Sequence, residues 1–397
     1  MNKGHACQEL THRKKVLFTL LTLFVVWLIS DTIAYVTLRY LRETKNVFIT
    51  IRPATSDEQV WRWYERSPFH ARWGWDIPED RKGKFGNRKG REYGIRNRYA
   101  IKVFGDSFAY GAGVKDSETF EYLIEEKTGW DFLNYGVTGF GTDQALLKYA
   151  DNGIKTRYTV LSILDENIER ILDNCRGLLD PRQAKKPKPR FWIRPDGSIT
   201  LLENPLKSPS DLHKLKDISF LESLKEHQYW SKYYEKLHAP SELRWPATLT
   251  IIPHFDYFLG TVARQAGHAA WPTYESHVSR LPYNHLYEEG SEGLKIMRHI
   301  IKQFGATAAA RDEIPVIVVF PKREALKIIR KYGKKPYQSM VDFLKAEGHG
   351  FIDFGDVFTD KDISKYYIAD GHYSLAGNEV IANELIRFIQ RLNLENS

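Results

Sequence analysis

The stretch VFGDSFAYGAGV, residues 103–114, places a serine directly after an apolar segment. Residues 99–105, YAIKVFG, have the composition of a strand, and small residues follow Ser107 closely. In α/β proteins the carboxyl end of a strand is the usual location of ligands and catalytic groups. The stretch therefore predicts a strand that ends just before Ser107 and presents this serine at the edge of a sheet.

Segments of strand and helix pattern alternate on both sides of this stretch. Further strands are predicted over 130–136, 158–164, 314–320 and 350–358, and helices over 117–129, 142–154, a Lys/Arg-rich segment ending near Ala346, and 376–392. Ser117 is the expected N-cap of the first helix, and Gly129 is its expected end. Some of these strands are apolar on both faces, which predicts a three-layer α/β domain with a mostly parallel sheet.

A large insertion interrupts this pattern. Residues 171–313 lack the alternation, and they divide the domain into a first half, 99–170, and a second half, 314–397. Residues 46–98 form an irregular lead-in. Pro195-Asp196-Gly197 predicts a hairpin within the insertion. Its many aromatic side chains either pack a core, the more frequent case, or offer stacking faces to sugar rings: Tyr229, Trp230, Tyr233, Tyr234, Trp245, Tyr257, Trp271, Tyr274, Tyr283 and Tyr287.

Residues 16–38 form an expected membrane span after a tail of residues 1–15. Val16 to Ile29 is uncharged and mostly apolar, and with Asp31 tolerated the run is long enough to cross a bilayer. A cleaved signal peptide is the alternative, but no small-x-small cleavage site follows. Lys and Arg flank the span equally, so their distribution assigns no orientation. Because long domains cross membranes largely regardless of charge, we expect the catalytic domain outside the cytoplasm.

Composition argues against several partners. The chain has 397 residues, 42% of them hydrophobic, which is enough for a substantial core. Its net charge of +8 comes without a nucleic-acid-binding signature, so no nucleic-acid partner is expected. Four histidines of the insertion lack the close spacing of metal ligands, so neither a metal nor a cofactor is expected: His254, His268, His277 and His285. Cys7 and Cys175 lie on opposite sides of the expected span, so no intrachain disulfide is expected.

Groups that could activate a serine follow at three other places. A nucleophilic serine needs a base for its proton and donors for the oxyanion that develops. Gly139 lies in a glycine-rich turn after the second predicted strand, Asn167 follows the third, and Asp370 and His372 precede the last helix. Each alone is more often a turn, a helix cap or a surface residue, but their joint order at strand ends favours a shared site.

This order resembles the four sequence blocks of the SGNH/GDSL hydrolase family, which has a flavodoxin-like domain. Gly105-Asp106-Ser107 resembles the first block, and Asn134 followed by Gly139 is similar to the second. Asp165-Glu166-Asn167 keeps the asparagine of the third block without its glycine. Asp370-Gly371-His372 is one residue shorter than the usual Asp-x-x-His of the fourth. The resemblance covers about 100–170 and 311–395.

The resemblance implies nucleophilic catalysis on an ester. Ser107 would attack the carbonyl, His372 would take its proton, and Asp370 would orient the imidazole. The N–H groups of Ser107 and Gly139 and the side-chain amide of Asn167 would form the oxyanion hole. Because the fourth block is one residue shorter than usual, it supports His372 as the base better than it supports Asp370 as the orienting carboxylate.

Three functions remain open from the sequence. The first is a membrane-anchored serine esterase that hydrolyses small acyl esters such as O-acetyl groups, with cell-surface carbohydrate as the acyl carrier. The second is an O-acyltransferase that passes the acyl group to a sugar hydroxyl. The third is a catalytically silent binding module that keeps the fold.

Overall fold

The computed structural model describes residues 11–44, 47–90, 100–270, 281, 283–358 and 362–395. Predictions for residues 1–10, 91–99 and 271–280, which include Cys7, Trp271, Tyr274 and His277, lie outside the described residues.

A five-stranded sheet forms the centre of the molecule, and all of its strand pairs are parallel. Its order is β11–β10–β5–β3–β4, with bounds β3 Ile101–Phe104, β4 Phe132–Asn134, β5 Tyr158–Leu164, β10 Ile314–Phe320 and β11 Phe351–Asp353. Counted along the chain this is the 2-1-3-4-5 order of flavodoxin-like sheets. The predicted parallel α/β sheet is thus confirmed, and β5 and β10 have the predicted bounds.

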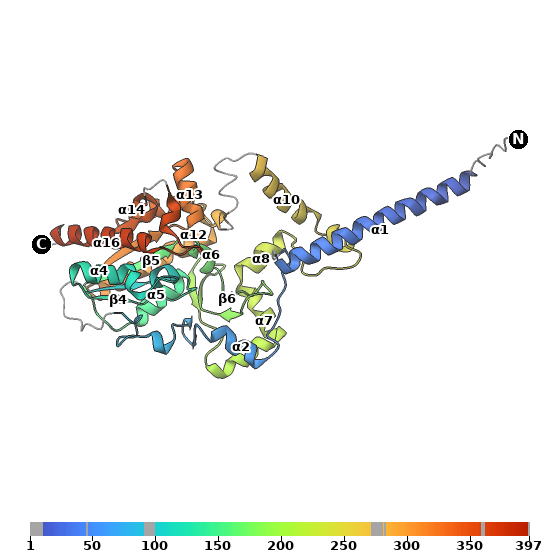
Figure 1. Ribbon diagram of the computed structural model, residues 1–397. Coiled ribbons are helices and arrows are strands. Elements are labelled where there is room, and N and C mark those ends of the chain that lie inside the picture. Colours follow the sequence, from blue (N-terminus) through green and yellow to red (C-terminus); the bar gives the residue numbers. More distant parts are fainter. Residues whose placement is uncertain are drawn as a thin grey trace.

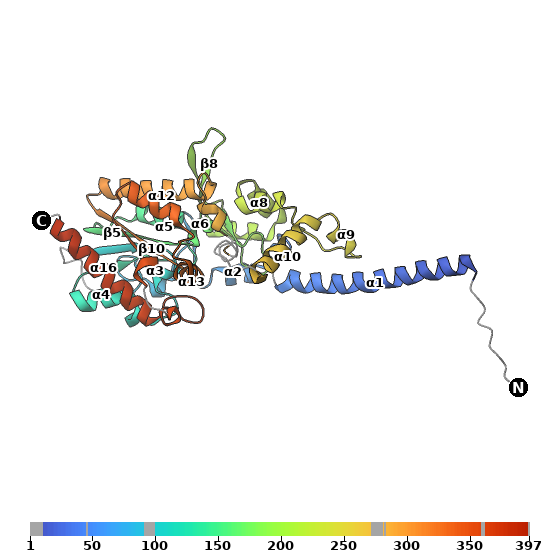
Figure 2. The same cartoon turned by 90° about the horizontal axis from the view of Figure 1, so that it is seen from above.

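Helices cover both faces of the sheet (Figures 1 and 2). The core on one face holds side chains of α5 (Thr142–Asp151), α12 (Glu292–Ala310) and α14 (Gln338–Ala346). The core on the other face holds side chains of α4 (Phe120–Thr128) and α16 (Leu375–Glu395). Within β10, Ile317 and Val319 enter the first core, whereas Val316 and Val318 enter the second. This alternation explains why the strand is apolar throughout.

Three predicted elements differ from the structure. The N-cap of α4 is Thr119, not Ser117, because Ser117 lies in a preceding 3-10 turn, η2 (Asp116–Glu118). The Lys/Arg-rich helix is two helices, since α13 (Arg323–Tyr332) ends at Gly333, which has a left-handed φ of 65°, before α14 begins. The strand predicted over 350–358 stops at Asp353. The Asp353 carboxylate accepts the N–H of Gly355 and starts the short helix α15, Phe354–Val357.

The residues predicted as an insertion carry mostly short elements beside one end of the sheet. They are β6 (Cys175–Arg176), β7 (Lys186–Pro187), β8 (Arg190–Ile193), β9 (Ile199–Leu202), η3 (Pro209–Lys216), α7 (Ile218–Ser223), η4 (Leu224–His227), α8 (Tyr229–Lys236), α9 (Thr248–Ile251), α10 (Phe255–Ala270) and η5 (Asn284–Tyr287). The β8–β9 pair is the predicted hairpin. The helix α12 follows them and packs against β10 and α5, so it belongs to the α/β layers.

The lead-in contains the short elements α2 (Asp57–Tyr64), β1 (Phe69–His70), β2 (Gly74–Trp75) and η1 (Glu79–Arg81). Before it, the helix α1 (His12–Thr44) projects away from the α/β domain (Figure 1). It is long and apolar enough to cross a membrane. Its side chains are exposed as far as Ser30, and Asp31 is the first buried one.

An ion pair is buried between the sheet and its helices. Lys102 Nζ, on β3, lies 2.7 Å from Glu313 Oε1, and both side chains are fully buried. Tyr149 OH and the Thr156 N–H also donate to the Glu313 carboxylate, at 2.9 and 3.2 Å. Burial lowers the pKa of Lys102, although Glu313 opposes this shift. Each charge is therefore tolerated only because the other is present.

We expect Lys102→Met to lower the free energy of unfolding by about 3–5 kcal/mol, because it leaves the Glu313 carboxylate buried without its cation. Adding Glu313→Gln should recover most of this loss, since the amide is neutral and keeps partners for Tyr149 and Thr156. Urea denaturation of the detergent-solubilised protein measures both effects. The control is Lys155→Met, which removes a cation from the exposed pair with Asp312 and should change stability little. Equal losses of stability in Lys102→Met and Lys155→Met would contradict the argument.

Candidate active site

The turn after β3 holds Ser107 at the first position of the short helix α3, Ser107–Tyr110. The Asp106 carboxylate accepts the N–H of Phe108 at 2.9 Å and thereby caps this helix. Gly105 is needed for close packing, since a Cβ there would lie 2.3 Å from Ser162 Oγ on the neighbouring strand β5. Ser107 is 5% exposed, so its hydroxyl is held in a well-defined place at the sheet edge.

His372 meets this serine from the loop before α16. Its Nε2 lies 2.9 Å from Ser107 Oγ, within hydrogen-bonding distance. The hydroxyls of Tyr367 and Tyr373, which flank the loop, both donate to the carbonyl of Pro321, at 2.9 and 3.3 Å. Because Pro321 directly follows β10, these two bonds tie the histidine loop to the carboxyl end of the sheet. The ring of Phe108 packs against the imidazole, with 5.1 Å between centroids.

Asp370 lies on the other side of the imidazole despite the shortened sequence spacing. Its Oδ1 is 3.1 Å from His372 Nδ1 and also accepts the backbone N–H of His372 at 3.0 Å. This backbone bond is the main cause that lowers the pKa of Asp370, so the carboxylate stays ionised. The contact with Nδ1 has ion-pair distance, but Nδ1 makes no well-directed hydrogen bond. Asp370 thus contacts His372 at both its ring and its backbone.

Three donors that the resemblance assigns to an oxyanion hole follow β3, β4 and β5. Asn167 begins α6 (Asn167–Arg170) and is fully buried, yet neither polar atom of its side chain has a hydrogen-bond partner among the described residues. Gly139 adopts a left-handed φ of 83°, which favours glycine. Buried amides are nearly always satisfied, so the Asn167 side chain is a candidate donor to a bound group.

Asn134 supports the site from the end of β4. Its side-chain amide donates to the carbonyl of Ala109 at 2.7 Å and to Glu121 Oε1 at 2.8 Å, and its Oδ1 accepts the Gly136 N–H at 2.8 Å. These bonds join the glycine-rich turn to the helix that begins with Ser107. Asn134 therefore fixes the position of both segments.

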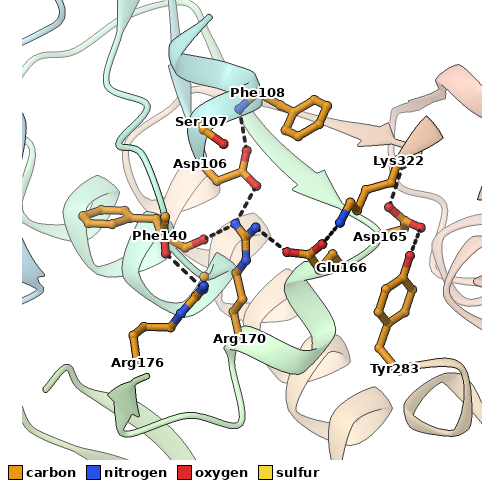
Figure 3. Close-up of polar contacts among 12 residues, drawn as sticks. Asp106, Ser107, Phe108, Phe140, Asp165, Glu166, Arg170, Arg176, Tyr283 and Lys322 are labelled. Atoms are coloured by element: carbon orange, nitrogen blue, oxygen red, sulfur yellow. Dashed lines mark hydrogen bonds and ion pairs between the residues drawn. The ribbon is translucent and has the colours of Figure 1, made fainter. Parts of the chain in front are cut away.

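A chain of charges, fully buried at Asp106 and partly exposed at Lys322, lies behind the nucleophile turn (Figure 3). Arg170 Nη1 contacts Asp106 Oδ2 at 3.1 Å and the carbonyl of Phe140 at 3.2 Å, and its Nη2 contacts Glu166 at 2.5 Å. Glu166 also pairs with Lys322. Arg170 and Lys322 lower the pKa of Glu166 to about 2, which outweighs its burial. The guanidinium thus joins the serine turn to the loop after Gly139.

Asp165 connects the same region to the insertion. Its carboxylate is fully buried and accepts Tyr283 OH at 2.6 Å and the Lys322 N–H at 2.8 Å, while its carbonyl accepts Tyr287 OH at 2.7 Å. Burial raises the pKa of Asp165 to about 7, because it outweighs the two hydrogen bonds. Tyr283 and Tyr287 therefore serve as packing and hydrogen-bonding residues rather than as exposed stacking faces.

The structure thus brings Ser107, His372 and Asp370 together, and the parallel strands deliver Gly139 and Asn167 to the same edge. Sequence reasoning missed the supporting residues Arg170, Glu166 and Lys322. Arg170 and Glu166 follow β5, and Lys322 follows β10. Their position at strand ends was the feature of the sequence that could have identified them as part of the site. Their pairing was not visible, because it depends on strand order.

No family model and no curated protein matches the sequence. The structure is similar to a member of the lipolytic protein G-D-S-L family from Veillonella parvula (9% identity, 74% of this chain and 99% of that one, TM-score 0.34). It is also similar to the lipase/acylhydrolase from Enterococcus faecalis (12% identity, 73% and 95%, TM-score 0.34). These low similarities assign no role to any residue of this chain.

The raised pKa of Asp165 predicts how stability depends on pH. An unfolded aspartate has a pKa of about 3.9, so between about pH 4 and 7 the folded protein retains a proton that the unfolded chain releases. This contribution to stability is complete below about pH 4 and is lost as the pH rises to about 7. As the pH rises from 5 to 8, we expect the thermal unfolding temperature of Asp165→Asn to fall less than that of the wild type.

The matched control is Asp312→Asn, which neutralises a carboxylate whose side chain is 95% exposed. Its pH profile should follow that of the wild type. Parallel profiles for Asp165→Asn and wild type would show that Asp165 is ionised throughout this range and would contradict the assigned shift.

Proposed function

We propose that the protein is a serine esterase that cleaves small acyl esters through an acyl-enzyme on Ser107. The observation that carries this proposal is the 2.9 Å contact between Ser107 Oγ and His372 Nε2, at the carboxyl edge of a flavodoxin-like sheet. The SGNH/GDSL resemblance of the four sequence blocks agrees with these roles. Asp370 Oδ1, 3.1 Å from His372 Nδ1, supports its assignment as the orienting carboxylate.

The reaction uses these residues in two steps. Ser107 Oγ attacks the ester carbonyl while His372 Nε2 takes the hydroxyl proton, and the negative charge on the carbonyl oxygen meets the amide of Asn167 and the N–H groups of Ser107 and Gly139. The carbon–oxygen bond to the alcohol then breaks, and His372 protonates the departing alcohol. Water, activated by the same imidazole, releases the acid and restores Ser107. Asp370 stabilises the imidazolium that forms in each step.

We further propose that α1 anchors the enzyme in a membrane, with the α/β domain outside the cytoplasm. The exposed apolar helix and its projection from the domain support the anchor (Figure 2). O-acetyl groups on cell-surface carbohydrate are the substrate class that we propose for an enzyme in this position.

An O-acyltransferase would use the same acyl-enzyme but pass the acyl group to a sugar hydroxyl instead of water. Incubation with an acetyl donor and an added glycan separates the two, by comparing acetate released with acetate retained on the glycan. A catalytically silent binding module is the third candidate, and it predicts no acyl transfer in either assay.

Ser107→Ala should abolish labelling of the detergent-solubilised protein by a fluorophosphonate probe, together with hydrolysis of p-nitrophenyl acetate, because it removes the nucleophile. Ser219→Ala, which removes an exposed hydroxyl from α7, should retain both signals. Signals that survive unchanged in Ser107→Ala would refute the nucleophile. Their absence from the wild type would favour the silent module.

Asn167→Ala should lower kcat by roughly a hundredfold or more, since loss of one oxyanion donor costs about 3 kcal/mol of barrier. The same change should leave the thermal unfolding temperature almost unaltered, because the amide has no hydrogen-bond partner to lose. Asn134→Ala is the contrasting variant, because it breaks three hydrogen bonds and should lower the unfolding temperature. A stability loss in Asn167→Ala that matched this one would indicate a structural role instead.

A further inference from the structure

An apolar surface outside the active site is formed by α9, the first part of α10 and the turn before them. This segment, residues 245–263, is called the arm below. Its exposed large apolar side chains are Trp245, Leu249, Ile252, Phe255, Leu259 and Val262. Ile252 is 71% exposed and Val262 63% exposed. Among the 19 residues of the arm, Asp256 is the only Asp, Glu, Lys or Arg.

The arm is joined to α1 by specific contacts. The buried carboxylate of Asp31 accepts the N–H groups of Ala247 and Thr248, at 2.6 and 2.8 Å, and so caps the start of α9. Ala247 also packs in a small apolar core with Leu38 of α1. Arm and helix are therefore held in one orientation rather than merely lying near each other.

The position of these contacts along α1 places the arm where α1 leaves its exposed apolar stretch. The side chains of α1 are exposed as far as Ser30, and Asp31 is the first buried one. A bilayer core of about 30 Å needs about 20 helical residues. Counted from Val16, the first residue after Arg13-Lys14-Lys15, about 20 residues end near Tyr35. If this stretch spans the core, the arm, which contacts Asp31 and Tyr35, lies near its domain-side boundary (Figures 1 and 2).

We infer that the arm is a second membrane-binding element, which lies in the interface of the same bilayer that α1 crosses. This inference rests on the anchor proposed above. The partner is a phospholipid surface, because the exposed face is almost uncharged and continues the apolar surface of α1. Phe255, Leu259 and Val262 follow the i, i+4, i+7 spacing of one helix face, as expected for a helix lying in the plane of a membrane.

An aromatic pair between the arm and α1 indicates how deep the arm lies in the membrane. Trp245, which is half exposed, contacts Tyr35 of α1 edge to face with 5.4 Å between ring centroids. Trp and Tyr are enriched at the level of lipid headgroups, where an apolar ring and a polar tip are both accommodated. With two elements in the bilayer, the domain would be fixed in rotation and tilt, whereas α1 alone would leave it free to rotate.

Depth-dependent quenching in the full-length protein tests the inference. Single cysteines are placed at Leu259 in the arm, Leu21 in α1 and Leu394 near the end of α16, each in a Cys7→Ser background. Each is labelled with an environment-sensitive fluorophore, and the protein is reconstituted into phosphatidylcholine nanodiscs that carry nitroxide lipids. The remaining thiol, Cys175, is buried, and burial raises its pKa, so it should not label.

We expect the label at Leu259→Cys to shift to shorter emission wavelengths and to be quenched most by nitroxides near the headgroups. The label at Leu21→Cys should be quenched most by nitroxides near the ends of the acyl chains. Leu394 is an exposed leucine at the opposite end of the molecule, and its label should not be quenched. Adding Phe255→Glu should reduce quenching at position 259, whereas adding Ile218→Glu, at an exposed apolar residue of α7, should not.

The outcomes distinguish this inference from the proposed anchor. Quenching at Leu21 without quenching at Leu259 overturns the arm as a membrane element and leaves the anchor intact. Absence of quenching at Leu21 overturns the anchor, and the inference with it. Crosslinking between two Leu259→Cys chains without lipid quenching would assign the apolar face to a second copy of the protein and would also overturn the inference.

Discussion

The hydrogen bond between Ser107 and His372 depends on two strand ends being held in fixed register. The two residues are 265 positions apart and belong to loops that follow β3 and precede α16. Parallel strands place their carboxyl ends at one edge, so β3 and β10, on either side of β5, bring both loops there. The Pro321 carbonyl then completes the arrangement by accepting two tyrosine hydroxyls from the histidine loop. The position of His372, which lies on a loop, is therefore fixed by the sheet.

Buried charges define this edge more strongly than apolar packing does. Asp106, Arg170, Glu166 and Lys322 form a chain in which each charge has an opposite neighbour. A buried charge without a partner is costly, so such a chain tolerates few alternative arrangements. Apolar side chains of similar volume would permit small shifts of the turn at Ser107. Asn167 follows β5 at the same edge, and its buried side-chain amide has no hydrogen-bond partner among the described residues.

The residues outside the α/β layers divide into parts with different physical roles. Tyr283 and Tyr287 bind the carboxylate and carbonyl of Asp165, so this part of the predicted insertion buttresses the sheet edge. Trp245 and the apolar side chains near it face outward beside α1 instead. Aromatic residues that looked like one cluster in the sequence thus belong to a protein interior in one case and to an exposed surface in the other.

The five strands of the central sheet, the order of the four blocks and the apolar helix α1 could be predicted from the sequence, because they follow from local hydrophobic pattern and short spacings. The sequence also identified Ser107 and His372 as partners, through the resemblance of their blocks. It did not reveal the ends of β11 and α13, where Asp353 and Gly333 stop the pattern through capping and a left-handed backbone. Nor did it reveal Asp31 capping α9 or Arg170 pairing with Asp106. Such contacts join residues far apart in the chain, and only the packing of strands, helices and insertion decides which distant charges meet.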